Sequence, residues 1–375
     1  MTMIPFNKPY MTGKELHYIS QAYNNEQLAG DGSFTQKCHA WLEQNSGCQR
    51  ALLTHSCTAA LEMAALLSEV RPGDEVIMPS YTFVSTANAF ALRGAVPVFV
   101  DICDDTLNID ERLIEQAITQ RTKVIVPVHY AGVGCAMEKI LEIAETNNLM
   151  VVEDAAQGLM AKYHGKPLGT FGQFGTVSFH ETKNIISGEG GALVVNDMAF
   201  VERAEIIREK GTNRSQFFRG QVDKYTWVDI GSSYLPGEII AAFLFAQFEE
   251  AEKITQKRLE IWSQYHEALE ELESMALIRR PVIPEGCAHN AHMYYIRTRT
   301  ASERGKLLNW LEERGVQAVF HYVPLHSSPA GTKYGVISGT LDNTQFASET
   351  IIRLPLWIGF NDVEKVVSII RDFFH

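Results

Sequence analysis

The sequence predicts an α/β fold in which a large domain with a mainly parallel sheet is followed by a smaller C-terminal α+β domain. Short apolar strand patterns alternate with helical patterns between residues 51 and 154, which is typical of parallel strands joined by right-handed crossovers. Several strands are unbroken apolar runs, as expected where a sheet is covered on both faces. The chain of 375 residues is also too long for one ordinary core. We therefore expect a large domain over residues 1–245 and a linking helix with a small domain over residues 246–375.

The elements of the expected large domain follow one another in a regular order. A glycine turn at 28–35 comes first, and Ser33 or Thr35 is expected to cap a helix that runs through Cys38 and Trp41. The predicted strands are 51–54, 76–79, 96–100, 124–128, 149–152, 175–179 and 192–196. Helices are expected at 57–67, 110–118 and 136–147.

The C-terminal part is expected to begin with one long helix from about Gly237. Apolar residues recur there at spacings of three and four and mark one face of the helix. These residues are Trp262, Tyr265, Leu269 and Leu272. A strand at 292–296 and a helix around 304–314 are expected in the small domain.

Composition excludes several classes of protein. Hydrophobic residues make up 46% of the chain and charged residues 21%, which is typical of a globular domain. The 33 basic and 45 acidic residues give a net charge of 33 − 45 = −12, which argues against a general nucleic-acid-binding protein. The first residues lack the apolar core of a signal peptide, and no apolar run is long enough to span a bilayer, so we expect a cytoplasmic location.

The cysteines and histidines predict neither a disulfide framework nor a metal site. The six cysteines are scattered and form no C-x-x-C pair. His289 with His292, and His321 with His326, have ligand-like spacings, but no compact set of further ligands accompanies them. We therefore expect no bound metal.

The first candidate site residue is Lys183. It lies in the segment 178–184, between a short apolar strand and the glycine-dense turn 188–191 that leads to the next strand. Its amine is therefore expected in a corner between two strands, where a Schiff-base lysine is useful. A lysine in a loop is more often a solvated surface group, so this interpretation depends on its neighbours.

The second candidate is the acid at the end of the strand 149–152. Glu153 and Asp154 follow four apolar residues, and the carboxyl end of a buried parallel strand is a usual position for a ligand contact. A carboxylate that simply caps the following segment is the alternative.

The third candidate is the segment 51–67. It contains a short apolar strand, a turn rich in hydroxyl groups and an Ala/Leu-rich helix. The free N–H groups at the start of such a helix can bind an anion, although an ordinary N-cap would show the same pattern. Together the three candidates supply an anion cradle, a carboxylate and an amine, which are the groups that pyridoxal phosphate requires of a protein.

These motifs resemble the DegT/DnrJ/EryC/StrS family of pyridoxal-phosphate sugar aminotransferases. The resemblance runs from residue 4 nearly to the C-terminus, and its most specific segments are 79–89, 153–158, 178–184 and 210–227. The last segment is similar to the transaminases of TDP-4-oxo-6-deoxy-D-glucose. The resemblance implies a fold-type I enzyme, pyridoxal 5′-phosphate as cofactor, L-glutamate and a nucleotide-linked keto sugar as substrates, and a homodimer with two shared active sites.

The resemblance also implies roles for individual residues. Lys183 would form the imine with the cofactor and later move the proton as general acid/base. The expected cofactor-binding residues are Cys57 and Thr58 with Ser178 at the phosphate, Asp154 at the pyridinium, Gln157 near the phenolic oxygen, Phe83 over the ring, and Ser233, which stands where many relatives carry an asparagine that reaches across the dimer. The expected substrate-binding residues are Gly30, Arg208, Arg219, Lys224, Tyr225, His292, His321, Tyr322 and His326.

The segment 208–227 also indicates a nucleotide site from its own composition. Five basic and four aromatic side chains are interleaved in it, against two acids. Such a local charge reversal suits a diphosphate, with aromatic rings available to stack on a base, whereas a solvated loop is the alternative.

We therefore predict amination at C4 of TDP-4-keto-6-deoxy-D-glucose, with the galacto-configured product favoured. A C3 aminotransferase, or a C4 enzyme of opposite stereochemistry, would share these motifs. A related dehydratase would carry histidine at the position of Lys183. A non-catalytic regulator that binds the cofactor would need neither the lysine nor the basic segment.

Overall fold

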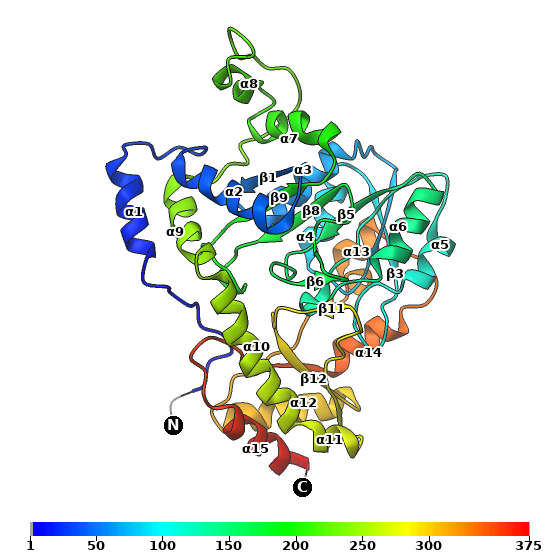
Figure 1. The fold of residues 1–375 in the computed structure, drawn as a ribbon. Helices are drawn as coiled ribbons and strands as arrows, with labels where there is room; N and C mark the ends of the chain where they lie inside the picture. Colours follow the sequence, from blue (N-terminus) through cyan, green and yellow to red (C-terminus); the bar gives the residue numbers. More distant parts are fainter. Residues whose placement is uncertain (1–2, 375) are drawn as a thin grey trace.

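A computed structural model describes residues 3–374, and an eight-stranded sheet lies at its centre (Figure 1). The strands are ordered β1-β9-β8-β5-β4-β2-β3-β13. Their bounds are β1 (Arg50–Thr54), β2 (Glu75–Pro79), β3 (Val96–Val100), β4 (Thr122–Ile125), β5 (Met150–Asp154), β8 (Phe174–Ser178), β9 (Gly191–Val195) and β13 (Val336–Ile337). β9 is antiparallel to β1 and β8, and the other neighbours are parallel. The predicted mainly parallel sheet is confirmed.

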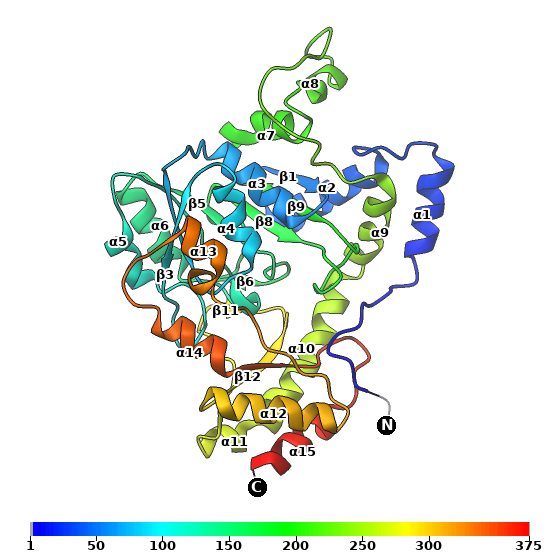
Figure 2. The same ribbon diagram turned by 180° about the vertical axis from the view of Figure 1, so that it is seen from behind.

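Helices cover both faces of this sheet. One face carries α3 (Cys57–Leu67), α4 (Val84–Ala91) and α7 (Val201–Arg208). The opposite face carries α2 (Ser33–Ser46) and α9 (Glu238–Phe248) at one end, and α5 (Ile114–Ala117) and α6 (Met137–Thr146) at the other. The alternation along β1 shows the two faces, because Leu52 packs in the first core while Ala51 and Leu53 pack in the second. α1 (Glu15–Asn24) lies outside α9 (Figures 1 and 2).

The helix at residues 33–46 is capped by a residue that the sequence analysis did not name. Neither Ser33 nor Thr35 caps it as predicted, because the N-cap position is Gly32. The buried carboxylate of Glu238 instead accepts the backbone N–H groups of Gly32, Phe34 and Thr35 at 2.8–3.1 Å. A carboxylate is stabilising at a helix N-terminus, and here it comes from the first turn of α9, about 200 residues away in the chain.

The single long helix predicted from Gly237 is two helices. α9 ends at Phe248 and α10 (Ala251–Ala268) begins after Glu249 and Glu250. The backbone of Glu250 leaves the helical region, with φ −111° and ψ 9°. Phe248 is held in the large domain, where it stacks on Trp41 at 4.2 Å, so the break lets α10 turn toward the small domain. The four residues predicted to form one apolar face are all buried, but only Trp262 and Tyr265 belong to α10, since Leu269 and Leu272 lie beyond its end.

The small domain packs helices against a three-stranded antiparallel sheet. Its elements are α10, α11 (Glu270–Ser274), β10 (Ile278–Arg279), β12 (Tyr294–Thr298), α12 (Ala301–Glu313), β14 (Ile351–Leu354) and α15 (Val363–Phe374), with sheet order β10-β12-β14. The predicted boundary at residue 245 stays a proposal. Two segments do not follow it: Ile4 packs in the small-domain core, and residues 325–341 return to the large domain.

The remaining elements are short. They are β6 (Lys162–Tyr163), β7 (Lys166–Pro167) and β11 (Cys287–Ala288), which form a second three-stranded sheet, together with α13 (Pro329–Tyr334), α14 (Asp342–Thr350) and 3-10 turns at Glu111–Leu113, Tyr130–Gly132, Met198–Phe200 and Leu325–Ser327. No helix within residues 3–374 has the length and apolar character needed to cross a bilayer.

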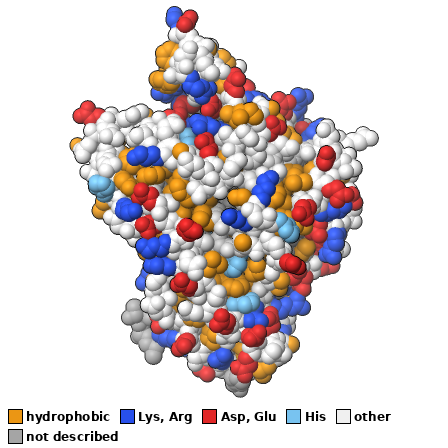
Figure 3. All heavy atoms as spheres, viewed as in Figure 1, with side chains coloured by type: hydrophobic (Ala, Val, Ile, Leu, Met, Phe, Trp, Pro, Cys, Tyr) orange, Lys and Arg blue, Asp and Glu red, His pale blue; other side chains and the backbone are white. Residues whose placement is uncertain are grey.

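Residues 209–236 form an arm that projects from the large domain. It contains α8 (Arg214–Phe218) and stands beyond α7 in both views (Figures 1 and 2). Backbone bridges from Glu209 to Ser233 and from Thr212 to Trp227 close its base. Hydrophobic side chains gather on it in Figure 3, and Phe218, Tyr225 and Trp227 are 52–77% exposed. The arm therefore presents aromatic surface that no other part of residues 3–374 covers.

Candidate active site

A cavity of about 860 Å³ opens at the edge of the central sheet where its parallel strands end. β1 and β8 both run opposite to β9, so the carboxyl ends of β1, β2, β5 and β8 meet at this edge. The large domain forms one wall of the cavity, and residues 319–322, β14 and the segment before β12 form the other. This is the position at which open α/β sheets bind ligands.

Lys183 reaches the cavity from a closed loop between β8 and β9. The loop is held by backbone hydrogen bonds from Phe179 to Gly190, from Glu181 to Gly188 and from Lys183 to His180, each at 2.8–2.9 Å. Gly188 has φ +81°, a conformation that favours glycine. The loop backbone thus fixes the origin of the lysine side chain.

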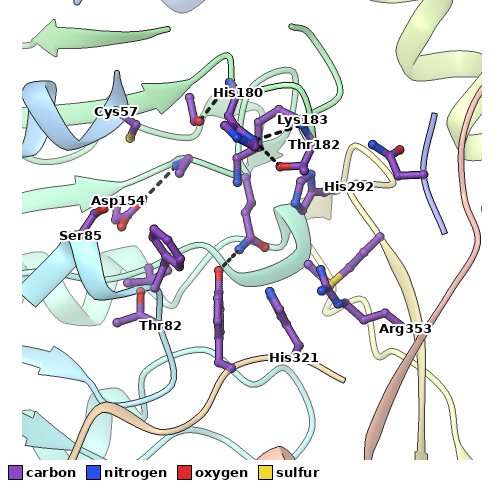
Figure 4. Close-up of a pocket in the computed structure, with 18 of the residues that line it drawn as sticks. Cys57, Thr82, Ser85, Asp154, His180, Thr182, Lys183, His292, His321 and Arg353 are labelled. Carbon is purple, nitrogen blue, oxygen red and sulfur yellow. Dashed lines mark hydrogen bonds between the residues drawn. The ribbon is translucent and has the colours of Figure 1, made fainter. Parts of the chain in front are cut away.

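The residue after the lysine ties this loop to the small domain. The Asn184 side-chain amide donates to the carbonyl of Asn290 at 2.8 Å, and its oxygen lies 3.1 Å from Nδ1 of His292. Figure 4 shows Lys183 and His292 on the same side of the cavity. His292, predicted from the sequence as a substrate residue, therefore also positions the lysine loop.

The cavity lowers the pKa of the Lys183 amine below its ordinary value. Burial is the largest cause, and the positive charge of Arg353 acts in the same direction. The charge of Asp154 acts against it. A larger share of the amine is therefore neutral at a given pH than for a solvated lysine, as a base or nucleophile requires.

Asp154 ends β5 and is held in one orientation. Its Oδ2 accepts a hydrogen bond from Thr86 Oγ1 at 2.7 Å, and its Oδ1 accepts the N–H of Ala156 at 3.1 Å. The Thr86 hydroxyl lies 2.8 Å from that of Thr82. The buried carboxylate faces the cavity in Figure 4, so it offers a fixed negative charge to a cationic ligand group.

The start of α3 forms the expected anion cradle. Ser56 caps the helix, its side chain accepting the N–H of Ala59 at 3.1 Å. The N–H groups of Cys57 and Thr58 belong to the first helical turn, where no intrahelical acceptor exists. Gly191 at the start of β9 lies against this turn, and a Cβ there would come within 2.4 Å of the Cys57 nitrogen. Glycine is therefore required for the sheet to meet the cradle.

Hydroxyl groups complete the cradle. Thr58 Oγ1 and Ser85 Oγ are 2.7 Å apart, and Ser178 at the end of β8 also lines the cavity. Phe83, the N-cap of α4, is 57% exposed at the cavity. Its ring is free to cover a planar ligand.

Gln157 and Tyr322 join the two walls. The Gln157 side chain accepts the N–H of Ala131 at 2.7 Å and donates to the Tyr322 hydroxyl at 3.0 Å. Next to Tyr322, His321 Nδ1 lies 2.7 Å from the Tyr130 hydroxyl. Burial lowers the pKa of His321, so this imidazole is neutral in the closed cavity.

Two arginines in the cavity wall were not predicted from the sequence. Arg258 donates to the carbonyls of Ala291 and His292 at 3.0 and 2.8 Å, so it supports the segment before β12. Arg353 projects from β14, and among the described residues it forms no ion pair with a carboxylate. Neither Arg258 nor Arg353 lies in one of the sequence patterns at strand ends from which the other site residues were predicted. The local sequence therefore does not mark these two arginines as site residues.

Seven predicted site residues lie outside the cavity of their own chain. These are Gly30, Arg208, Arg219, Lys224, Tyr225, Ser233 and His326. Arg208 is buried and bonded to the Leu53 carbonyl and to Asp31, so its charge is paired within its own chain. Arg219 pairs with Glu205 of α7 at 2.7 Å, and His326 Nδ1 lies 2.8 Å from the Ser80 hydroxyl.

The residues in the cavity fit pyridoxal phosphate. The helix N-terminus and the surrounding hydroxyls suit its phosphate, and a fixed carboxylate suits its pyridine nitrogen. The lowered pKa of the Lys183 amine favours its reaction with the cofactor's aldehyde. The exposed ring of Phe83 can stack on the flat face of the cofactor. The Gly191 contact, which leaves no room for a side chain beside the cradle, agrees with this donor set.

Comparison with known proteins gives a consistent result. The sequence pattern of the DegT/DnrJ/EryC1/StrS aminotransferase family matches residues 9–371. The UDP-4-amino-4-deoxy-L-arabinose–oxoglutarate aminotransferase of Shewanella sediminis is 34% identical over 382 residues, covering 98% of this chain and 97% of that protein. The GDP-perosamine synthase of Escherichia coli O157:H7 is 34% identical over 330 residues, covering 88% and 87%. The PLP-form of Spr1654 from Streptococcus pneumoniae superposes with a TM-score of 0.89 at 26% identity, covering 99% and 97%.

Proposed function

Because the chain belongs to the DegT/DnrJ/EryC1/StrS aminotransferase family, we propose that it transfers an amino group from L-glutamate to C4 of TDP-4-keto-6-deoxy-D-glucose. The proposed product is TDP-4-amino-4,6-dideoxy-D-galactose, a building block for surface polysaccharide. Family membership confirms that the chain is a fold-type I sugar aminotransferase whose cofactor is pyridoxal phosphate. The observation that carries the proposal is the amine of the half-buried Lys183, with its lowered pKa, in one cavity with the fixed carboxylate of Asp154.

The side chains of the cavity support this chemistry. Pyridoxal phosphate bound there supplies an electron sink that makes the donor Cα proton acidic. The amine of Lys183 is the base that takes this proton, since burial keeps more of it neutral. Asp154, oriented by Thr86 and Ala156, stabilises positive charge on a ligand group in the cavity. The hydrogen bond from Gln157 to Tyr322 links the two walls of the cavity.

The donor and the position of amination are supported by one named relative. The Shewanella sediminis enzyme is named for a nucleotide-linked 4-amino-4-deoxy sugar and for oxoglutarate, the keto acid of glutamate. Amination at C4 with a glutamate–oxoglutarate pair is therefore chemistry that this scaffold is known to carry. The TDP nucleotide and the galacto configuration rest on the resemblance of residues 210–227 to the TDP-4-oxo-6-deoxy-D-glucose transaminases.

A homodimer with shared sites is part of the proposal. Lys224 and Tyr225 lie on the arm, well outside the cavity of their own chain, and the arm is rich in exposed aromatic surface. An arm that covers the mouth of a second copy's cavity would bury this surface and bring Lys224 to the nucleotide. Residues of one chain would then complete the site of the other.

Incubation with L-glutamate and TDP-4-keto-6-deoxyglucose tests the proposal, with NMR of the isolated aminosugar as the readout. An axial amine at C4 is the expected result. An equatorial amine at C4, or amination at C3, would replace the substrate assignment while keeping the reaction class. Cofactor binding without amination of any nucleotide keto sugar would favour a regulator instead.

A further inference from the structure

Asn290 is a buried side chain that joins three parts of the fold without lining the cavity itself. It lies in the connection before β12 and is 1% exposed. Its side-chain amide donates to the carbonyls of Gln157 and Leu159, each at 2.8 Å. Its Oδ1 accepts the N–H of His292 at 3.0 Å. Both donors and the acceptor of the amide are therefore used, as a buried polar side chain requires.

The side chain of Asn290 holds a segment that has no regular structure of its own. Residues 156–160 form turns after β5, and Gln157 lines the cavity from them. Gly132 also packs against Asn290, next to Ala131, whose N–H bonds the Gln157 side chain. A Cβ at Gly132 would overlap Oδ1 of Asn290, so glycine is required there. Asn290 thus fixes the turns that carry Gln157.

The backbone of the same residue holds the lysine loop. The Asn290 carbonyl accepts the side-chain N–H of Asn184, the residue after Lys183, at 2.8 Å. The next residue, Ala291, has φ +50°, a conformation that residues other than glycine rarely adopt, so the contacts around it must hold this segment in place. A chain of hydrogen bonds therefore runs from the Gln157 carbonyl, through Asn290, to the neighbour of Lys183.

We propose that Asn290 is a positioning residue that sets the distance between Lys183 and the segment that carries Asp154 and Gln157. This inference rests on the proposed role of Lys183, but it does not depend on which sugar is aminated. The pairing of β5 with β8 aligns Asp154 with Thr176, and Lys183 lies in the loop that follows β8. A ligand held by both walls of this corner needs the loop fixed as well as the strands, and the bonds of Asn290 supply that support.

A purely structural role is the alternative, because a buried amide with two carbonyl partners stabilises a fold wherever it lies. The two roles differ in how the contacts of Asn290 combine. For positioning, its side chain and its carbonyl act in series, since the first holds residue 290 to the turns and the second holds Asn184. Breaking either link releases the lysine loop, so breaking both should add little, whereas two independent stabilising contacts would add.

The test measures the Lys183 amine directly in the cofactor-free protein. Competitive labelling with dinitrofluorobenzene at several pH values, followed by peptide mapping, gives the pKa and the reactivity of this amine. Burial lowers this pKa in the wild type, so it should rise toward that of a solvated lysine in Asn290→Ala and in Asn184→Ala. The double variant should match Asn184→Ala alone.

Two measurements on the cofactor-loaded protein complete the test. The visible circular dichroism per bound cofactor reports the orientation of the ring, and it should change in both single variants. The rate at which L-glutamate bleaches the cofactor band should fall about 10- to 100-fold, the usual effect of a small misplacement of a reacting group. The double variant should again show no larger change than Asn184→Ala.

Asn196→Ala is the matched control. Asn196 also donates to two carbonyls, those of Gly169 and Gly172, at 3.0 and 2.8 Å, but it lies at the other end of β9 from the lysine loop. Its loss is expected to lower the melting temperature while the labelling of Lys183, the dichroism and the bleaching rate stay within twofold of the wild type. If Asn290→Ala does not fold, Asn184→Ala compared with this control carries the test, because it breaks the same chain of bonds from the other end.

The proposal is overturned if Asn290→Ala lowers the melting temperature but leaves the labelling of Lys183 and the dichroism as in the wild type. It is equally overturned if the two single effects add in the double variant. Failure of the proposed function looks different. In that case L-glutamate does not bleach the cofactor band of the wild type, whereas labelling of the cofactor-free protein still reports whether Asn290 positions the lysine.

Discussion

The two walls of the cavity are built on different principles. In the large-domain wall, the polar groups of Asp154, Gln157 and the loop around Lys183 each have a partner within the chain. In the small-domain wall, Arg353 forms no ion pair with a carboxylate of residues 3–374. These internal bonds keep the geometry of the large-domain wall through every turnover, as a resident cofactor requires. An arginine without a paired carboxylate suits an anionic ligand that binds and dissociates in each turnover. The comparison indicates that the large-domain wall is the one built to hold a resident cofactor.

Replacing Lys183 should give the largest effect. Lys183→Ala removes both the covalent link to the cofactor and the base, so turnover is expected to fall by about 10⁴-fold or more. Borohydride treatment of the wild type followed by peptide mapping should place the label on Lys183. Lys210→Ala, on the exposed base of the arm, is the control and should keep the label. A label on any other lysine would show that the large-domain wall does not hold the cofactor this way.

Asp154→Asn tests the charge of the same wall without changing its shape. Removing one fixed charge from a buried site is expected to lower turnover about 10²- to 10³-fold, while part of the cofactor stays bound at the α3 cradle. Absorbance titration measures the bound cofactor and steady-state kinetics the turnover. Near-normal turnover would mean that Asp154 only caps the segment after β5.

The large-domain wall could be predicted from sequence because each of its parts is local. A strand that ends in Asp154, a turn that opens α3 and a loop that carries Lys183 are all short patterns, and a parallel sheet brings their ends to one edge. The small-domain wall has no such signal. Arg353 reaches the cavity only because β14 pairs with β12 and with Val319.

The lack of a local signal for long-range contacts also explains where the predicted elements differ from the observed fold. The cap of α2 was missed because Glu238 is distant in sequence, and the break between α9 and α10 depends on which core holds Phe248. The bonds of Arg208 to Asp31 and to the Leu53 carbonyl, on segments far away in the chain, could likewise not be predicted from the local composition of residues 208–227. Local patterns therefore predicted the elements and the strand-end residues, and long-range packing decided the rest.

A third prediction tests whether residues of the arm complete the active site of a partner chain. Lys224 is exposed and has no ion pair among the described residues, so Lys224→Glu is expected to weaken nucleotide-sugar binding about tenfold to a hundredfold by placing a like charge against the diphosphate. In a mixed dimer with Lys183→Ala, one site receives Lys183 from one chain and Lys224 from the other. Mixing should then restore about a quarter of wild-type activity at low substrate, if subunits exchange at random.

The control for this experiment mixes Lys183→Ala with Asp154→Asn. Both lesions lie in the large-domain wall of a single chain, so no mixed dimer contains an intact site and no activity should return. Mass spectrometry verifies the exchange. If exchange is complete and the Lys224→Glu mixture stays inactive, the arm does not act across a dimer.

The smallest expected effect is on the free energy of unfolding, which burial of the Lys183 amine makes dependent on pH. Its pKa is lowered in the folded, cofactor-free protein, mainly by burial, so between that pKa and about 10.4 the unfolded chain binds more protons than the folded one. The free energy of unfolding should therefore rise with pH across this window and lose the gain as pH falls through the folded pKa. In Lys183→Met this contribution is absent, so the variant should be more stable than the wild type at neutral pH, and the difference should shrink as the pH approaches 10. Urea unfolding of both cofactor-free proteins at several pH values measures it. A difference that is constant with pH would mean that the amine is solvated before the cofactor binds, and that the large-domain wall is less closed than the contacts around Lys183 indicate.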